Sequence, residues 1–142
     1  MGITLDDDTR QYLATFEDVT GVNGRDCIVT GERESRLLIV VETDRIGEAI
    51  GPGGRTVTRF EKQIDMPVRL VEGADDPEEF VANALAPAAV YNVTISENDD
   101  TVAYVEVARE DRGVAIGSSG RRIDAARRLA ERHFGIDDVQ LI

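Results

Sequence analysis

The sequence contains no tryptophan, and cysteine and histidine occur once each, as Cys27 and His133. A single cysteine excludes an internal disulfide and a multi-cysteine zinc site. Cys27 lies in a β-type apolar run, so we expect a small buried hydrophobic residue. His133 stands in the last turn before Gly135, so we expect it to interact with a helix C-terminus. No nucleophile and orienting partner can be assembled around this histidine from the spacing, and we expect no enzyme activity.

Long apolar runs and nucleotide-binding motifs are also missing. No run approaches the roughly 20 apolar residues of a membrane span, and the first residues lack the basic and then apolar pattern of a signal peptide. Neither G-x-x-x-x-G-K-[ST] nor G-x-G-x-x-G occurs, so nucleotide cofactors are not expected. Asp6-Asp7-Asp8 is interpreted as a helix start and not as a metal site, because adjacent helical side chains point in different directions. We therefore expect a cytoplasmic protein with no cofactor, no metal and no membrane partner.

Lysine is nearly absent: Lys62 is the only one, against 15 arginines, and the formal net charge is −12. The charge is segregated, because residues 45–62 and 109–132 hold 11 basic and 6 acidic residues, while the rest of the chain has a net charge of −17. An acidic, lysine-poor surface is typical of proteins kept soluble in a very salty cytoplasm, since carboxylates hold water and the lysine stem adds apolar surface. An ordinary acidic protein is the alternative.

An internal repeat recurs at an offset of 66 residues. The stretch Ala49-Ile50-Gly51-Pro52-Gly53-Gly54-Arg55 has its second copy in Ala115-Ile116-Gly117-Ser118-Ser119-Gly120-Arg121. The apolar helix-face positions that follow each turn correspond as well: Val57, Phe60 and Ile64 align with Ile123, Ala126 and Ala130. A chance pair of glycine turns would not bring the core register with it, so the repeat indicates a duplication.

Each copy is predicted to fold in the order helix, strand, strand, helix, turn, helix, strand. Periodicity and turn signals place the elements of the first copy in a helix that ends before Gly21 and then at 26–30, 36–42, 45–50, 55–64 and 68–71. The elements of the second copy are expected at 78–86, 91–96, 101–107, 109–116, 121–134 and 138–142. In the strand at 91–96, alternation places Tyr91, Val93 and Ile95 on the buried face.

The two glycine turns are the candidate functional sites. Two glycines three residues apart let the backbone turn tightly and leave it bare, so a sugar-phosphate chain can approach the main-chain N–H groups. This is the device by which KH domains clamp nucleotide backbones. A single Gly-x-x-Gly is weak evidence, whereas a pair with the same flanking pattern favours the nucleotide clamp over a purely structural turn. The residues expected to contact RNA are Ile50, Gly51, Pro52, Gly53, Gly54 and Arg55 in the first copy and Ile116, Gly117, Ser118, Ser119, Gly120 and Arg121 in the second.

A further basic stripe leaves two interpretations open. Arg121, Arg128 and Arg132 fall close together on a helical wheel, opposite the alanines of the core face. They can form an RNA-binding stripe, or a solvated face in which Asp124 and Glu131 pair with arginines three or four residues away. Arg55 and Arg121, directly after the turns, are the stronger candidates for phosphate contact.

Three segments carry a resemblance to a known family. They are Asp44-Arg45-Ile46-Gly47-Glu48-Ala49-Ile50-Gly51-Pro52-Gly53-Gly54, Asp75-Asp76-Pro77-Glu78-Glu79-Phe80 and Arg132-His133-Phe134-Gly135-Ile136-Asp137-Asp138-Val139. With them the chain resembles the archaeal NusA-type transcription factors over nearly its whole length. The resemblance implies tandem type II KH domains that bind single-stranded RNA during transcript elongation and termination. Members of the family often carry lysine at the third loop position, where this chain has Gly53 and Ser119.

The sequence therefore predicts an α+β fold of two tandem type II KH domains, residues 1–73 and 74–142, each with a three-stranded sheet covered by three helices. We expect a monomer that binds the nascent transcript as single-stranded RNA, with RNA polymerase as a second partner. The alternative is an adapter that binds RNA polymerase through KH folds with little RNA affinity.

Overall fold

The computed structural model describes residues 6–31 and 34–142. The chain divides into two compact units, Met1–Gly73 and Ala74–Ile142. Within the described residues, each unit contains one three-stranded sheet, in the order β1-β2-β3 in the first and β4-β5-β6 in the second. Both sheets pair their first two strands antiparallel and their last two parallel. The α+β class expected from the sequence is confirmed.

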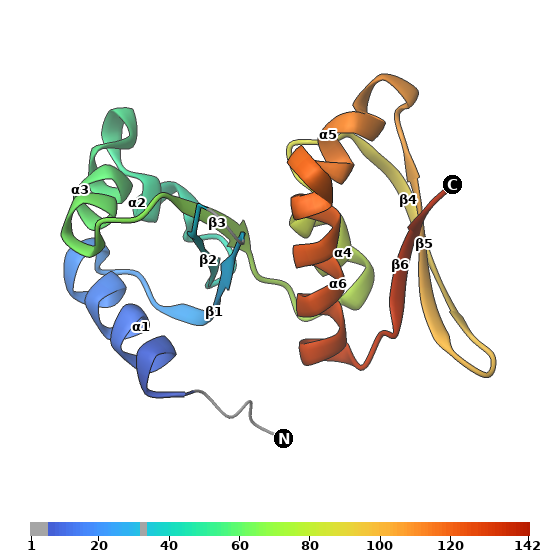
Figure 1. Ribbon diagram of the computed structural model, residues 1–142, viewed down its shortest axis with the longest axis horizontal. Helices are drawn as coiled ribbons and strands as arrows, with labels where there is room; N and C mark the ends of the chain where they lie inside the picture. The colour runs from blue at the N-terminus through green and yellow to red at the C-terminus, as the bar shows by residue number, and fades with distance from the viewer. Residues whose placement is uncertain (1–5, 32–33) are drawn as a thin grey trace. The chain divides into compact units, whose positions relative to one another are not determined.

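The elements of the first unit follow the predicted order of helix, strand, strand, helix, turn, helix and strand (Figure 1). Its elements are α1 (Asp7–Thr20), β1 (Gly24–Thr30), β2 (Arg36–Val41), α2 (Ile46–Ile50), the 3-10 turn η1 (Pro52–Gly54), α3 (Arg55–Ile64) and β3 (Val68–Glu72). Helix α1 begins at a capping aspartate, because the Asp6 carboxylate accepts a hydrogen bond of 2.8 Å from the N–H of Thr9. The carboxylate of Asp6 thus has a structural use at the helix start.

The core of the first unit lies between its helices and its sheet. Phe16 of α1 and Phe60 of α3 are fully buried and meet edge to face, with ring centroids 5.2 Å apart. Cys27 of β1 is buried in the same cluster, as expected. The aromatic pair fixes α3 against α1, and α3 is the helix that leaves the first glycine turn.

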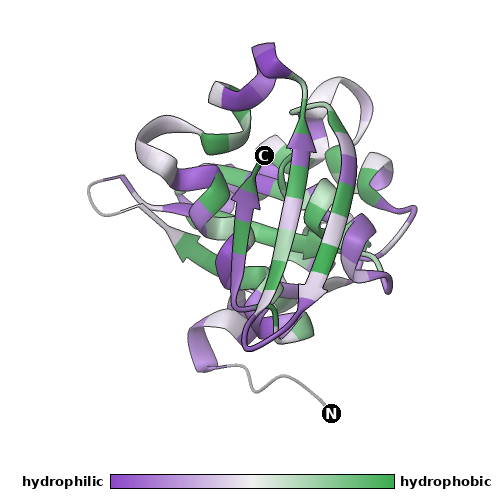
Figure 2. Cartoon of the chain, turned by 90° about the vertical axis from the view of Figure 1, so that its right-hand side faces the viewer, coloured by the Kyte–Doolittle hydropathy of each residue, from purple (hydrophilic) through white to green (hydrophobic). Residues whose placement is uncertain are grey.

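The second unit repeats the order of elements. They are α4 (Pro77–Ala84), β4 (Val90–Glu97), β5 (Thr101–Val107), the 3-10 turn η2 (Arg109–Asp111), α5 (Arg112–Ile116), the 3-10 turn η3 (Ser118–Gly120), α6 (Arg121–Phe134) and β6 (Asp138–Leu141). Helices α4 and α6 lie on one side of the sheet (Figure 1). The predicted core positions Ile123, Ala126 and Ala130 of α6 are all buried. Figure 2 faces the other side of this sheet, where hydrophilic and hydrophobic residues alternate along the strands.

Three sequence expectations are wrong in detail. The side chain of Tyr91 is 68% exposed instead of buried, because a bulge between Val90 and Asn92 inserts one extra residue and interrupts the alternation. The helix expected at 78–86 ends at Ala84, since the residue before Pro87 is disfavoured in a helix. The single helix expected at 109–116 is divided into η2 and α5, with non-helical backbone at Asp111 (φ −101°, ψ 2°).

Candidate nucleic-acid interface

The two glycine turns have the same backbone conformation. The first glycine has φ 77° and ψ 171° at Gly51, and φ 80° and ψ 173° at Gly117. The last glycine is left-handed in both, with φ 75° at Gly54 and 74° at Gly120. The third position is also left-handed, at φ 62° for Gly53 and 54° for Ser119. The repeat seen in the sequence is therefore a repeat of geometry.

Only glycine fits the first position of each turn. A Cβ on Gly51 would lie 2.0 Å from Thr56 Oγ1 and 2.6 Å from Thr56 Cβ, and a Cβ on Gly117 would lie 2.8 Å from the Arg122 backbone nitrogen. Both glycines also occupy backbone angles that residues with a side chain almost never adopt. The turn thus packs its first glycine directly on the first turn of the following helix.

Backbone hydrogen bonds between residues three or four positions apart close each turn. In the first, the N–H of Gly51 donates to the Gly47 carbonyl at 3.0 Å, and the N–H of Gly54 donates to the Gly51 carbonyl at 3.0 Å. In the second, Gly117 donates to Gly113 at 2.9 Å and Gly120 to Gly117 at 3.1 Å. Within the described residues, no acceptor is found for the backbone N–H groups at the middle of the turns, those of Gly53, Ser118 and Ser119.

An isoleucine precedes each turn and lies at the surface. Ile50 and Ile116 are each 40% exposed, whereas Ala49 and Ala115, one residue earlier, are fully buried. The buried alanines anchor the short helices α2 and α5 to their units. Each isoleucine is thereby left as a partly open apolar surface beside the glycines.

The basic residues around the turns are held in different ways. Arg55 is exposed and Arg121 half-buried, each at the first position of its helix. On α6, Asp124 pairs with Arg127 at 2.9 Å, and Arg127 also binds Asp138 of β6 at 2.9 Å. Asp124 therefore forms an ion pair on α6 as expected, but its partner is Arg127, which lies outside the stripe of Arg121, Arg128 and Arg132.

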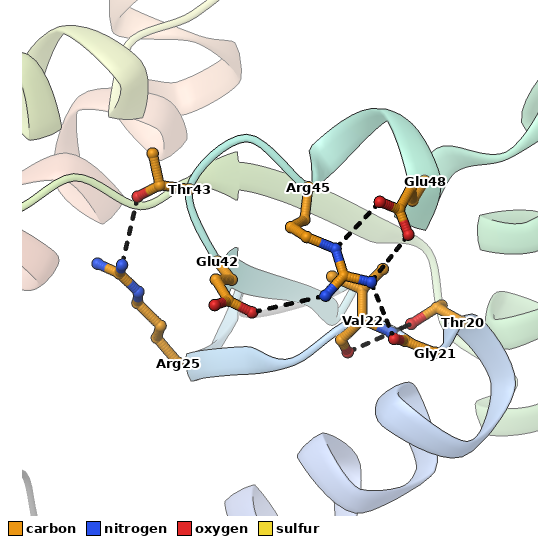
Figure 3. Close-up of polar contacts among 8 residues, drawn as sticks. All are labelled: Thr20, Gly21, Val22, Arg25, Glu42, Thr43, Arg45 and Glu48. Carbon is orange, nitrogen blue, oxygen red and sulfur yellow. Dashed lines mark hydrogen bonds and ion pairs between the residues drawn. The ribbon is translucent and has the colours of Figure 1, made fainter.

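The start of α2 is fixed by Arg45 (Figure 3). Its guanidinium binds the Glu48 carboxylate at 2.8 Å and the Gly21 carbonyl at 3.3 Å, and it lies 3.9 Å from the Glu42 carboxylate. The hydrogen bond and charge of Arg45 lower the pKa of Glu48. One side chain thus joins the end of α1, the end of β2 and the helix that leads into the first turn. The sequence analysis missed this role, although an arginine and a glutamate three residues apart are a recognisable pairing signal.

The second unit fixes α5 by other means. At the position equivalent to Arg45 stands Asp111, whose carboxylate accepts a hydrogen bond of 2.8 Å from the N–H of Ala89. Arg122, the second residue after the second turn, donates through Nη1 to the Val114 carbonyl of α5. Val114 stands where the first unit has Glu48, and its side chain is 38% exposed. The protein surface next to the second turn is therefore more apolar than the surface next to the first.

The remaining candidates of the sequence analysis lie away from the turns. The ring of His133 packs against Phe80 of α4 at a centroid distance of 5.4 Å. No group of three or more metal-binding side chains occurs among the described residues. Within that same part of the chain, every helix is too short or too polar to cross a membrane.

Two known proteins that resemble this chain in sequence share one name, and a family model of related name matches the second unit. A family model described as the NusA-like second KH domain matches residues 77–141, which lie in the second unit. A protein of Halococcus morrhuae named probable transcription termination protein NusA is 55% identical over 141 residues, covering 99% of each chain. A protein of the same name from Halobacterium salinarum is 52% identical with the same coverage. Both relatives come from halophilic archaea, which supports the interpretation of the acidic, lysine-poor composition. The crystal structure of APE1850 matches with a TM-score of 0.85 and 27% identity, covering 97% of this chain and 100% of that one.

Proposed function

This chain belongs to the archaeal NusA-like family of transcription termination proteins, and we propose that it is a non-catalytic transcription factor that binds single-stranded RNA. Its RNA is the nascent transcript, and RNA polymerase is a second partner. It acts as a cytoplasmic monomer. The name of its relatives and the KH family model support this role.

Both units are type II KH domains, residues 1–73 and 74–142. The family model supports this assignment for the second unit. For the first, the support is internal, because the same order of elements and the same sheet order recur in both units. The single observation that carries the function is the recurrence of one unusual turn conformation after an offset of 66 residues.

The RNA backbone is clamped at the two turns. The first glycine brings the main chain of the turn close to the start of α3 or α6, and the bare middle of the turn leaves room for a sugar-phosphate chain. Arg55 and Arg121, at the first positions of those helices, contact phosphates. Ile50 and Ile116 supply apolar contact for the bases. The residues proposed to contact RNA are Ile50, Gly51, Pro52, Gly53, Gly54, Arg55, Ile116, Gly117, Ser118, Ser119, Gly120 and Arg121.

Carboxylates placed in both turns test the clamp. The variant with Pro52→Asp, Gly53→Asp, Ser118→Asp and Ser119→Asp sets negative charge where phosphates would lie, and all four positions are exposed. We expect loss of RNA binding in a fluorescence anisotropy titration. Thermal unfolding should change little at Pro52, Ser118 and Ser119, because exposed substitutions usually alter the free energy of unfolding by less than about 0.5 kcal/mol each. Gly53→Asp should add a modest cost, since position 53 is left-handed, a conformation that aspartate tolerates better than most residues. Retained RNA binding by this variant would refute the clamp.

An adapter role is the second candidate, and the net charge of −12 together with turns that lack lysine favours it. In this case the KH folds bind RNA polymerase and have little RNA affinity. Purified RNA polymerase and single-stranded RNA, each titrated against the whole chain, separate the two candidates. Tight binding of the polymerase with no binding of RNA would establish the adapter and exclude the RNA-binding function.

A further inference from the structure

The two turns differ in the hydrogen-bond donors that they offer. In the second turn the middle positions are Ser118 and Ser119, whose two N–H groups have no acceptor within the described part of the chain. The two serine hydroxyls add two more donors. In the first turn the middle positions are Pro52, which has no N–H, and Gly53, which has no side chain. The first turn therefore offers one donor at these positions, and the second offers four.

The missing donor matters because of the shape of the turn. Successive N–H groups in a tight turn line a common concavity, which binds anions. In the second turn, Ser118 opens the 3-10 turn η3 and is followed by left-handed Ser119 at φ 54°, and both residues carry an N–H group. In the first, left-handed Gly53 at φ 62° follows Pro52, so the same concavity lacks its first N–H group. The backbones match, and only the chemistry of the lining differs.

The side chains next to the two turns also differ, and here too the second turn is the better suited to RNA. One helical turn before Gly51, α2 carries the exposed carboxylate of Glu48, whose negative charge is offset by Arg45 at 2.8 Å. The equivalent position before Gly117 is Val114, which is 38% exposed and uncharged. Together with Ile116, Val114 gives the second turn two partly exposed apolar side chains, where the first turn has Ile50 and a carboxylate.

High salt makes these short-range donors decisive. At about 1 M salt the Debye length is about 3 Å, so exposed arginines attract phosphates only weakly over distance. Hydrogen bonds from N–H and O–H groups to a phosphate in direct contact are less affected, and they are strong because the acceptor is charged. The number of donors in the turn then sets the affinity for the RNA backbone.

We infer that the two clamps are unequal, and that Ser118 and Ser119 in the second turn supply most of the affinity for the RNA phosphates. This inference rests on the proposed function, that the turns clamp RNA. The first turn is a weaker contact that holds the strand mainly through Ile50 and Arg55. An RNA strand is accordingly anchored at the second unit.

Exchanging the middle residues of the turns tests this assignment. Ser118→Pro with Ser119→Gly gives the second turn the residues of the first, and Pro52→Ser with Gly53→Ser makes the reverse change. The probe is a labelled single-stranded RNA of mixed sequence and about eight nucleotides, since one KH domain holds about four. Anisotropy titrations in molar KCl measure the dissociation constant of each whole-chain variant.

The first exchange should weaken binding at least about tenfold, equivalent to about 1.4 kcal/mol. The reverse exchange should leave affinity unchanged or increase it, because it adds donors. The Ser118→Pro, Ser119→Gly variant should keep the thermal stability of the parent protein, whereas the Pro52→Ser, Gly53→Ser variant should lose a little, because Gly53 is left-handed at φ 62°. Similar affinities for the parent and the Ser118→Pro, Ser119→Gly variant would overturn the assignment.

A second matched pair avoids proline. Ser119→Asp and Gly53→Asp each place one carboxylate at the left-handed third position, where aspartate is among the better tolerated residues. A Cβ on Gly53 meets no atom within 4 Å. We expect Ser119→Asp to weaken RNA binding at least about tenfold and Gly53→Asp to weaken it far less. Equal losses would refute the inequality while leaving the clamp intact, whereas a parent protein without RNA affinity would refute both.

Discussion

Replacing the first glycine of a turn gives the sharpest test of the turn geometry. We expect Gly51→Ala to destabilise the first unit strongly and Gly53→Ala, two residues away, to do so weakly. Gly51 combines a glycine-only conformation (φ 77°, ψ 171°) with a Cβ position 2.0 Å from Thr56 Oγ1. Gly53 is left-handed at φ 62°, but its Cβ position is open.

The magnitudes follow from two costs. The backbone conformation of Gly51 costs a residue with a side chain about 1–3 kcal/mol, and overpacking against Thr56 costs about a further 1–3 kcal/mol. For Gly53→Ala only the left-handed backbone counts, at roughly 1–2 kcal/mol, and alanine recovers about 0.4–1 kcal/mol by restricting the unfolded chain. That recovery applies equally to Gly51→Ala and cancels in the comparison. At the middle of these ranges Gly51→Ala should therefore be less stable than Gly53→Ala by about 2.5 kcal/mol, or about 10–20 °C in Tm for a unit of this size.

Amide hydrogen exchange in β2 is the assay, because it reports on the first unit separately from the second. Protection factors of the β2 amides should fall much further in Gly51→Ala than in Gly53→Ala. Adding Thr56→Ala to Gly51→Ala should recover part of the loss, since it removes the atom nearest the new methyl group. Equal protection in the two single variants would refute the argument that close packing, in addition to backbone conformation, requires glycine at position 51.

Two other predictions concern charge. Arg45 holds the pKa of Glu48 below its ordinary value of 4.5, mainly by a side-chain hydrogen bond, so the stabilisation from this pair is present above pH 4.5 and is lost as the pH falls through the lowered pKa. Arg45→Gln should therefore raise the titration midpoint of Glu48 measured by NMR, and an unchanged midpoint would contradict the contact in Figure 3. RNA binding should depend only weakly on KCl: a plot of the logarithm of the binding constant against the logarithm of the salt concentration should have a slope equivalent to at most about two or three phosphate contacts, at about −0.7 each. A steep slope with no binding in molar KCl would contradict the proposal that binding relies on the hydrogen-bond donors of the turns and on apolar contact.

The sequence predicted the elements well where the signal is local. Glycine at φ 77° or 80° has no substitute, so the two turns could be located from their glycines and from the helix face that follows, in which Phe60 is buried and Val57 and Ile64 are half-buried. Phe60 is indeed buried, and Ile123, Ala126 and Ala130 repeat its face in the second unit. These features depend on residues within a few positions of one another, and a linear pattern records such relations directly.

Tertiary structure decided what depends on residues far apart in the chain. Tyr91 faces solvent because β5 pairs with β4 across a bulge, and strand register is set by a partner that the alternation of one strand cannot reveal. Arg45 became the fixing point of α2 through the carbonyl of Gly21, 24 residues away. The comparison of the two turns required both. The sequence supplied Pro52 and Gly53 in one turn and Ser118 and Ser119 in the other. Only the folded backbone showed that the third position is left-handed in both turns, because dihedral angles are a property of the structure and not of residue order.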